Sequence, residues 1–304
     1  MSDSVNILAI VVTYHPESKA LLRLLDRLEK QVERILVVDN GSGDALTRLF
    51  EKRNRENEHL IPLEENLGVA AAQNVGIEQA RRRRADYIIL FDQDSEPAPD
   101  MVEQLYAVAK AKTAAGIKLA AVGPRYLDAR QDNPPPFIKI KGIRVERQPC
   151  NATDAVVDVD YLISSGCLIP LETVIQVGDM REMLFIDYVD IEWGLRAKSQ
   201  GYRSFGVCAA TMRHDLGDTP IKFFARMLPL HSPLRHYYHF RNALWLYRQG
   251  WLPIRWKLAD GQRLLLKYGF YTLFAEPRRL HWWMMTKGIW HGMGGKMGKL
   301  QENR

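Results

Sequence analysis

Two carboxylates stand two residues apart directly after a short apolar run. The run is 87–91 (YIILF), and Asp92-Gln93-Asp94 follows it. Carboxylates at this spacing can bind one hard divalent cation, because Mg²⁺ and Mn²⁺ prefer oxygen ligands and keep positions open for substrate phosphates. Taken alone, the tripeptide is more typical of a turn or a helix cap. Its place after a predicted buried strand makes a cation site an equally good interpretation.

Two further polar clusters have both a binding and a structural interpretation. Asp39 opens an Asp-Asn-Gly-Ser-Gly turn, and its carboxylate could accept the imide N–H of a uracil or thymine ring; a plain turn explains the same residues. Asn66-Leu67-Gly68 and the small residues after Asn74 would let a nucleotide approach the backbone closely. Close packing of a helix on a sheet explains them equally well.

Three acids open a predicted helix at 184–200. Asp187, Asp190 and Glu192 suit a helix N-terminus, which attracts negative charge. One of them could instead be a general base that deprotonates a hydroxyl group. Asp187 and Asp190 share a helix face, but the spacing does not choose between them. His214, further along, is by itself more typical of a structural or surface histidine.

The elements that must position these residues alternate between strands and helices. Continuous apolar runs predict buried strands, and leucine or alanine stripes predict helices. We expect strands at 7–13, 34–38, 60–63, 87–91 and 120–124, and helices at 18–33, 44–57, 68–84 and 99–115. An irregular excursion or hairpin follows at 125–149, then strands at 155–162, 167–170 and 202–210, and helices beyond 220. The pattern predicts an α/β fold with an open, mostly parallel sheet and helices on both faces, whose strand ends bind the ligand.

The whole chain has the composition of a soluble globular protein, with 304 residues, 46% hydrophobic and 26% charged. The three cysteines show no metal-binding spacing, and their odd number suits a reducing compartment. The N-terminus lacks the basic region of a signal peptide, and no apolar run approaches the ~20 residues of a membrane span.

The last 84 residues differ in charge from the rest. Residues 221–304 hold 15 Lys/Arg against 3 Asp/Glu and six of the seven tryptophans. We therefore expect two regions, a catalytic domain at 1–220 and a basic, aromatic, helical region at 221–304 that meets an anionic partner. Nucleic acid is not the expected partner, because no nucleic-acid fold motif is present and residues 1–220 are net acidic.

Taken together, the motifs resemble glycosyltransferase family 2, which has the GT-A fold. The resemblance covers roughly residues 5–215 and rests on Val11–Tyr14, Val38–Ser42, Asn66–Gly68 with Asn74–Gly76, Asp92–Asp94 and Phe185–Arg196. Within the family, the form of the last two motifs and Arg235-x-Tyr-Tyr-x-x-Arg241-Asn242 look most like bacterial rhamnosyltransferases that use dTDP-L-rhamnose. Galactofuranosyltransferases and other hexosyltransferases that use a UDP-sugar are the nearest alternative.

The resemblance implies roles for individual residues. The donor nucleotide-sugar would be bound by Thr13, Tyr14, Asp39, Asn66, Gly68, Asn74, Asp92, Gln93, Asp94, Ser165 and Arg241. Arg241 is included because many family members carry a basic residue near Gln73 and this chain does not. Mg²⁺ or Mn²⁺ would be bound by Asp92, Asp94 and His214. Asp190 would be the catalytic base, and the acceptor would meet Asp187, Glu192 and Trp193.

The implied reaction is a metal-dependent, inverting displacement in which the acceptor hydroxyl attacks the anomeric carbon and dTDP leaves. The acceptor would be a saccharide or a polyprenyl-diphosphate-linked saccharide of a growing polysaccharide, such as a lipopolysaccharide O-antigen. The enzyme would be cytoplasmic, peripheral on the inner membrane through its C-terminal region, and compatible with a homo-oligomer. A nucleotide-binding regulatory module is the non-enzymatic alternative, although it would not need Asp92, Asp94, Asp190 and His214 together.

Overall fold

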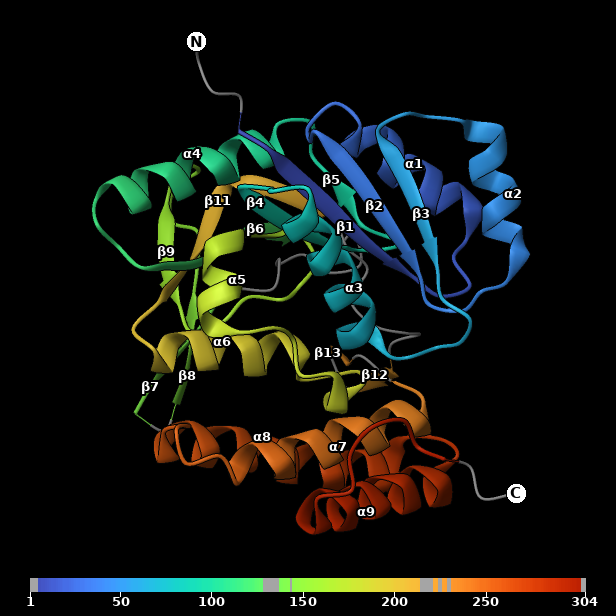
Figure 1. The fold of residues 1–304 in the computed structure, drawn as a ribbon. Coiled ribbons are helices and arrows are strands. Elements are labelled where there is room, and N and C mark those ends of the chain that lie inside the picture. Colours follow the sequence, from blue (N-terminus) through green and yellow to red (C-terminus); the bar gives the residue numbers. More distant parts are fainter. Residues whose placement is uncertain are drawn as a thin grey trace.

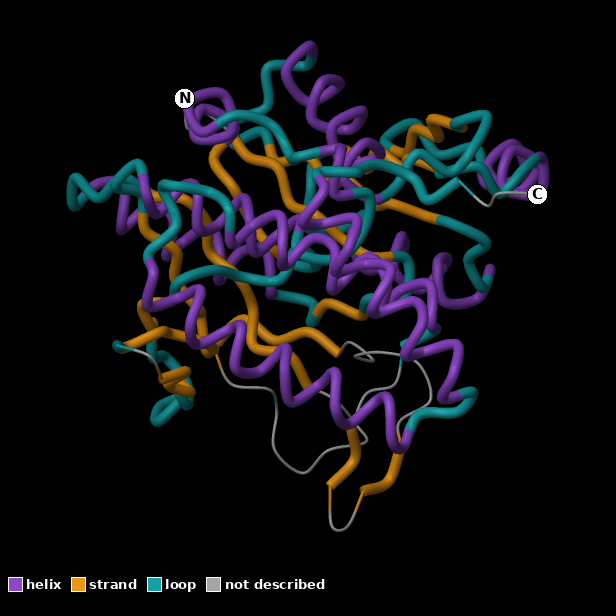
Figure 2. Tube along the Cα trace, turned by 90° about the horizontal axis from the view of Figure 1, so that it is seen from below, coloured by secondary structure: helices purple, strands orange, loops and turns teal. Residues whose placement is uncertain are grey.

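The computed structural model describes residues 5–127, 137–142, 144–213, 221–223, 226–228 and 231–301. They form an α/β unit with a central sheet, above a layer of C-terminal helices (Figure 1). Seen from below in Figure 2, these helices cross in front of strands of the sheet.

The first half of the chain alternates strands and helices as expected. Its elements are β1 (Ile7–Thr13), α1 (Ser18–Leu28), β2 (Arg34–Asp39), α2 (Asp44–Arg53), β3 (Glu58–Pro62), α3 (Val69–Arg82) and β4 (Tyr87–Asp92). The four strands pair in parallel in the order β3-β2-β1-β4. Their register places Thr13 opposite Asp39 and Val12 opposite Asp92, so the polar strand ends meet at one edge.

The second half adds antiparallel strands to the same sheet. Its elements are β5 (Glu96–Pro97), α4 (Met101–Ala114), β6 (Leu119–Leu127), β7 (Phe137–Lys141), β8 (Arg144–Gln148), β9 (Val156–Val159), β10 (Cys167–Pro170), α5 (Leu171–Val177), a 3₁₀ turn (Glu182–Leu184), α6 (Val189–Ser199) and β11 (Arg203–Arg213). The order continues from β4 through β10, β6 and β11 to β5, with β9 also paired to β11. β10 runs antiparallel to both β4 and β6, whereas β11 is parallel to β6. β7 and β8 form the expected hairpin.

Apolar side chains on both faces of the sheet hold the helices. Leu8, Ile10 and the other side chains on their face pack against α3, α5 and α6. Ile7, Ala9, Val11 and their neighbours pack against α1, α2 and α4. The parallel strands are thus buried on both faces, which explains why their sequences are continuous apolar runs rather than alternating ones.

The C-terminal region has its own core. It contains a short hairpin of β12 (Ile221–Phe223) and β13 (Arg226–Leu228), then α7 (Pro233–Tyr247), α8 (Ile254–Phe274) and α9 (Arg278–Gly294). Buried side chains of the three helices join Tyr188 and Leu195 in one cluster. α9 packs closely on α7 through Gly288 and Gly292, where a Cβ would lie 2.4 and 2.5 Å from main-chain oxygens of α7. The short hairpin replaces the helix that we expected directly after residue 220.

Smaller differences concern the ends of elements and the cysteines. α1 and α2 end several residues before the predicted positions, and the helix expected from 184 begins only at Val189. A disulfide joins Cys150 to Cys208, which the odd number of cysteines did not predict; Cys167 is a buried thiol.

Candidate active site

The ends of β1 and β2 form a buried polar pair. The hydroxyl of Thr13 donates a 2.9 Å hydrogen bond to Asp39 Oδ1. Ser42 donates to the same carboxylate through its main-chain N–H (2.9 Å) and its hydroxyl (2.5 Å). A carboxylate has about four acceptor positions, so three hydrogen bonds leave one for a ligand. Tyr14, the next residue, is 47% exposed beside this pair.

The Asp92–Asp94 loop is fixed by its neighbours. Its Gln93 side chain accepts a 2.7 Å hydrogen bond from the Tyr14 main-chain N–H. The Asp92 N–H donates to the hydroxyl of Ser165 (3.2 Å), which also contacts the hydroxyl of Ser95 at 2.6 Å. Both serines are fully buried, whereas Asp92 is half-buried and Asp94 is exposed. The loop is therefore fixed by hydrogen bonds to Tyr14 and Ser165, and the Asp94 side chain is exposed to solvent.

These two carboxylates suit a hard divalent cation, because they are oxygen ligands at the end of β4, on the edge of the sheet where β2 ends with Asp39. Within the described ranges, no group of three His, Cys, Asp or Glu side chains gathers in a way that could hold a metal ion. His214, the expected third ligand, lies outside the described residues.

Asp190 lies in the first turn of α6 and faces the same edge of the sheet. Burial raises the pKa of its carboxyl from 3.8 to about 6, main-chain N–H groups of Ile191 and Ser164 oppose the rise, and the Asp92 and Asp187 carboxylates add to it. The Asp92 carboxylate therefore lies near Asp190 in space, although the two acids are far apart in the sequence. A carboxyl with a pKa near 6 has the basicity expected of a general base at neutral pH.

The backbone before Asp190 is strained. Phe185, Asp187 and Tyr188 have φ values of +66°, +62° and +64°. Such left-handed conformations cost side chains other than glycine ~1–3 kcal/mol each and persist only where the surroundings impose them. Strain of this kind is concentrated at functional sites.

Side chains from α7 impose this conformation. The amide of Asn242 donates to the carbonyls of Leu184 (2.9 Å), Ile186 (2.8 Å) and Asp187 (2.8 Å). Arg241 donates to the Leu184 carbonyl at 2.9 Å. Because these are main-chain contacts, they fix the path of the chain into α6 and thereby the position of Asp190.

Arg241 is therefore not the diphosphate ligand that the sequence suggested. Its side chain is fully buried and its guanidinium also donates to the carbonyls of Met183 and Gly298. Asp187 is held differently, by an ion pair in which Arg235 Nε lies 3.1 and 3.3 Å from its carboxylate oxygens. Neutralised in this way, Asp187 is a weaker candidate for the base than Asp190.

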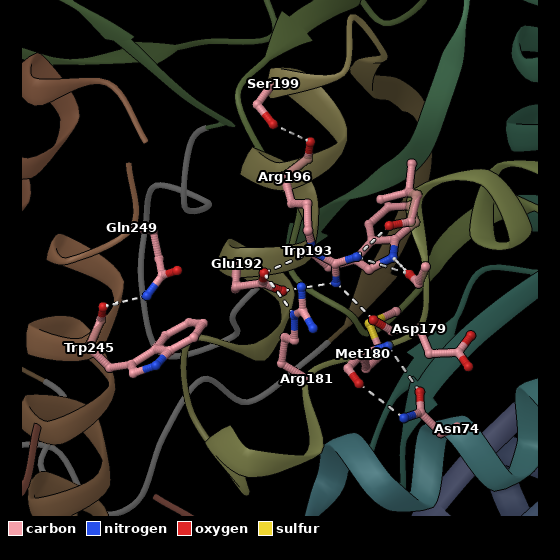
Figure 3. Close-up of polar contacts among 12 residues, drawn as sticks. Asn74, Asp179, Met180, Arg181, Glu192, Trp193, Arg196, Ser199, Trp245 and Gln249 are labelled. Atoms are coloured by element: carbon pink, nitrogen blue, oxygen red, sulfur yellow. Dashed lines mark hydrogen bonds and ion pairs between the residues drawn. The ribbon is translucent and has the colours of Figure 1, made fainter. Parts of the chain in front are cut away.

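Glu192 and Trp193 lie in the interior rather than at an acceptor surface (Figure 3). Glu192 is 1% exposed and forms a buried ion pair with Arg196, at 2.8 and 3.0 Å. The indole N–H of Trp193 donates to the Gly178 carbonyl at 2.9 Å. Trp193 thus joins α6 to the loop after α5, and Glu192 does so through a 3.7 Å ion pair with Arg181, so their expected contact with the acceptor is not supported by their location.

The glycine and asparagine motifs also hold loops together. Asn66 accepts hydrogen bonds from Asn40 (3.1 Å) and from the Gly68 N–H (2.9 Å). Gly68 has a φ of +91°, and a Cβ there would lie 2.5 Å from the Phe185 carbonyl oxygen. The Asn74 side chain donates a hydrogen bond to the Met180 carbonyl and accepts one from the Met180 main-chain N–H, both at 3.0 Å (Figure 3). These residues therefore hold the loops at this edge of the sheet in place.

Sequence reasoning missed the roles of Asn242, Ser95 and Arg235. The Arg-x-Tyr-Tyr-x-x-Arg-Asn pattern that contains Asn242 was visible, but its target carbonyls belong to another segment. Only the packing of α7 on the strained segment shows what the pattern does.

Comparisons with known proteins agree with the fold. Residues 9–168 match the pattern of glycosyl transferase family 2. The chain is 36% identical, over 251 residues and 82% of each protein, to the dTDP-rhamnosyl transferase RfbF of Shigella flexneri.

Two solved structures share the fold at low sequence identity. A structure of GalNAc-T7 with UDP, GalNAc and Mn²⁺ aligns with a TM-score of 0.61 at 11% identity, over 97% of this chain and 57% of that one. S. aureus TarS residues 1–349 with UDP-GlcNAc aligns with a TM-score of 0.59 at 17% identity, over 95% and 81%. The family pattern spans half of the chain and the relative most of it, so this chain belongs to glycosyl transferase family 2.

Proposed function

We propose that this glycosyltransferase transfers L-rhamnose from dTDP-L-rhamnose to a hydroxyl group of a growing bacterial polysaccharide. The observation that carries the proposal is the 36% identity, over 82% of the chain, to a protein named as a dTDP-rhamnosyl transferase. The site supports it, because the polar strand ends offer a buried acceptor for a pyrimidine base beside two carboxylates suited to a cation on a diphosphate.

The donor would lie across the ends of β1, β2 and β4. Asp39 has an acceptor position left for the imide N–H of thymine, and Thr13 and Tyr14 would border the base and ribose. Ser165 would shape the loop next to the sugar.

Asp92 and Asp94, with His214, would hold Mg²⁺ or Mn²⁺ beside the diphosphate. A bound cation would offset the negative charge that develops on the departing dTDP. Excess chelator should therefore abolish turnover; full activity in its presence would contradict metal dependence.

Asp190 would take the proton of the acceptor hydroxyl as that oxygen attacks the anomeric carbon. The C–O bond to dTDP breaks as the new bond forms, so one base suffices and the configuration inverts. Asp187 and Arg235 would position the base by fixing the residues before it.

A panel of nucleotide-sugars tests the donor. Nucleotide release with Mg²⁺ or Mn²⁺ should be fastest with dTDP-L-rhamnose. A UDP-sugar hexosyltransferase is the second candidate, since solved structures of this fold contain UDP or UDP-GlcNAc. Faster release from a UDP-sugar would favour it, and release from none would favour a non-catalytic nucleotide-binding module.

The exposed apolar side chains of α8 and α9 support a proposed attachment of this region to a membrane surface. Of the 16 exposed large apolar side chains in the described residues, 11 belong to these two helices. Trp282, Trp283 and Trp290 on α9 are 44%, 52% and 69% exposed, next to the exposed Arg278 and Arg279. Exposed tryptophans with basic neighbours suit the interface of an anionic bilayer, and no described helix has the length and apolarity to cross one.

The other tryptophans of the C-terminal region belong to its core. Trp256 is 3% exposed, and Trp245 and Trp251 pack against the same cluster, so these three tryptophans stabilise the region rather than form its outer face. A homodimer through α9 is less favourable, because it would bring two basic faces together.

Substitution of the three exposed tryptophans by serine tests this attachment and should weaken binding to anionic vesicles, while the packing of α9 on α7 is kept. The wild-type protein should sediment with anionic vesicles, release them as salt rises, and bind neutral vesicles weakly. Equal recovery of protein in the supernatant with both vesicle types would contradict membrane attachment.

A further inference from the structure

A short segment, residues 164–166, contacts both acids that the proposed reaction uses. The main-chain N–H of Ser164 donates a hydrogen bond to the Asp190 carboxylate. The hydroxyl of the next residue, Ser165, accepts one from the Asp92 N–H at 3.2 Å. A displacement of this segment would therefore change the position of the base and of the Asp92–Asp94 loop together.

Tyr126, near the end of β6, holds this segment in place. Its hydroxyl donates a 2.6 Å hydrogen bond to the Ser165 carbonyl, and the tyrosine is only 5% exposed. Gly166 packs closely on the same strand, since a Cβ there would lie 2.6 Å from Pro124 Cγ. The Gly166 N–H also donates to the Leu90 carbonyl of β4 at 2.6 Å. The segment is thus fixed against both β4 and β6.

The Tyr126 hydroxyl is a permanent donor rather than a titrating group. Burial raises its pKa well above the ordinary value of a tyrosine, and the charges of Cys167, Asp92 and Asp190 add to the rise. The hydroxyl therefore keeps its proton at neutral pH and can donate to the Ser165 carbonyl throughout the reaction. The influence of the two carboxylates also places this hydroxyl near both of them in space.

We infer that Tyr126 is a positioning residue for the transfer reaction, because through Ser165 it sets Asp92 and Asp190 relative to each other. The inference rests on the roles proposed above for these two acids and adds the residue that holds them. In a single displacement, the attacking hydroxyl and the departing diphosphate lie on opposite sides of the anomeric carbon. The base and the Asp92–Asp94 loop must therefore keep a fixed separation, and a misplacement of about 1 Å can lower a rate ~100-fold.

Tyr126→Phe tests this role, because it keeps the ring and removes only the hydroxyl. In saturating Mn²⁺, with the donor that the nucleotide-sugar panel identifies, kcat should fall about 10–100-fold while the donor KM stays within about threefold of wild type. Tyr106→Phe is the matched control and should keep the wild-type kcat. The Tyr106 ring packs edge-on against Tyr87 at the start of β4, whereas Asp92 ends that strand.

Binding of Mn²⁺ in saturating dTDP gives a second readout that needs no turnover. Electron paramagnetic resonance of the free ion measures the dissociation constant of each variant. Ser165→Ala removes the hydroxyl that contacts the Asp92 N–H and should weaken Mn²⁺ binding about three- to tenfold. Tyr126→Phe should weaken it by a similar factor. The double variant should lose no more affinity than Ser165→Ala, because the link from Tyr126 to Asp92 is then already broken.

An unchanged kcat in Tyr126→Phe would overturn the inference even if its Tm fell, because the tyrosine would then serve the core alone. An equal loss of kcat in Tyr106→Phe would overturn it as well. Additive losses of Mn²⁺ affinity in the double variant would contradict the route through Ser165. Absence of Mn²⁺ binding in the wild-type protein would remove the role of Asp92 on which the inference rests.

The Mn²⁺ measurement contains no donor sugar, so a failure of the proposed rhamnosyl transfer would appear separately, in the nucleotide-sugar panel. The dTDP affinity in excess chelator and the thermal unfolding curve of each variant show that its fold is intact.

Discussion

Replacing Asp190 by asparagine should make the protein inactive and more stable at the same time. The substitution keeps the size of the side chain and removes its charge and basicity. Because the substitution removes the proposed general base, it should lower kcat by ~10²–10⁴-fold while leaving dTDP affinity unchanged. The gain in stability follows from the environment of the carboxyl.

Its magnitude comes from the shift in pKa. A rise from 3.8 to about 6 corresponds to about 3 kcal/mol against the ionised native state at pH 7. Asparagine avoids this cost, but the N–H groups of Ile191 and Ser164 must then share one amide oxygen, which forfeits about 1 kcal/mol. We expect a net gain of about 2 kcal/mol, or a few degrees in Tm.

The sign of the pH dependence provides a stringent check. Because the folded pKa of Asp190 lies above the unfolded value, the native state retains a proton that the unfolded chain releases between about pH 4 and 6. The wild-type protein gains stability from that proton at pH 4 and has lost the gain above about pH 6. The advantage of Asp190→Asn should therefore be present at pH 7 and absent at pH 4.

Urea unfolding of both proteins in excess chelator at the two pH values measures this difference. Asp187→Asn is the matched control: it weakens the ion pair with Arg235 and should be less stable than wild type at pH 7. An Asp190→Asn protein no more stable than wild type at pH 7, or equally stabilised at pH 4, would refute the reasoning. A fully active Asp190→Asn protein would refute the assignment of Asp190 as the general base.

The remaining predictions concern the metal, the strained segment and the pH optimum. Asp94→Ala should lose nearly all turnover and keep its thermal unfolding curve, because Asp94 is exposed; retained turnover would exclude it as a ligand. Asn242→Ala should cost about 1–3 kcal/mol in urea unfolding and lower kcat at unchanged dTDP affinity, since the carbonyls of Ile186 and Asp187 lose this donor while that of Leu184 keeps Arg241; an equal kcat would contradict the positioning role. Gly68→Ala should lower Tm more than Gly43→Ala, because both glycines have positive φ but only Gly68 lacks room for a Cβ. The acid limb of kcat/KM should lie at or somewhat below pH 6, because a cation at Asp92 would remove one repulsion that raises the pKa of Asp190.

The parallel half of the fold and the meeting of its strand ends could be predicted from the sequence. Buried parallel strands are continuous apolar runs, and parallel pairing brings their carboxyl ends to one edge, so Asp39 and Asp92 had to lie near each other. The antiparallel insertion of β10 between β4 and β6 could not be predicted, because its pairing depends on residues far away in the chain.

Residue roles that depend on burial were predicted least well. Glu192, Trp193 and Arg241 belong to recognisable motifs, but residue type does not reveal whether a charged or aromatic side chain faces a ligand or the interior. Each turned out to satisfy main-chain or ionic partners inside the protein. The raised pKa of Asp190 was equally hidden, since it arises from burial and, in part, from Asp92, which only the fold brings near.

The contacts between α7 and the segment before α6 also restrict how relatives of this enzyme can be recombined. Asn242 reaches carbonyls 55–58 positions earlier in the chain, so the two segments encode the geometry of the base jointly. A chimera that joins residues 1–220 to the tail of a relative could assemble its sheet and bind nucleotide, yet leave Asp190 misdirected unless the incoming α7 matches residues 183–187. Exchange of acceptor specificity between such enzymes should therefore succeed when α6, its preceding segment and α7 are transplanted as one block.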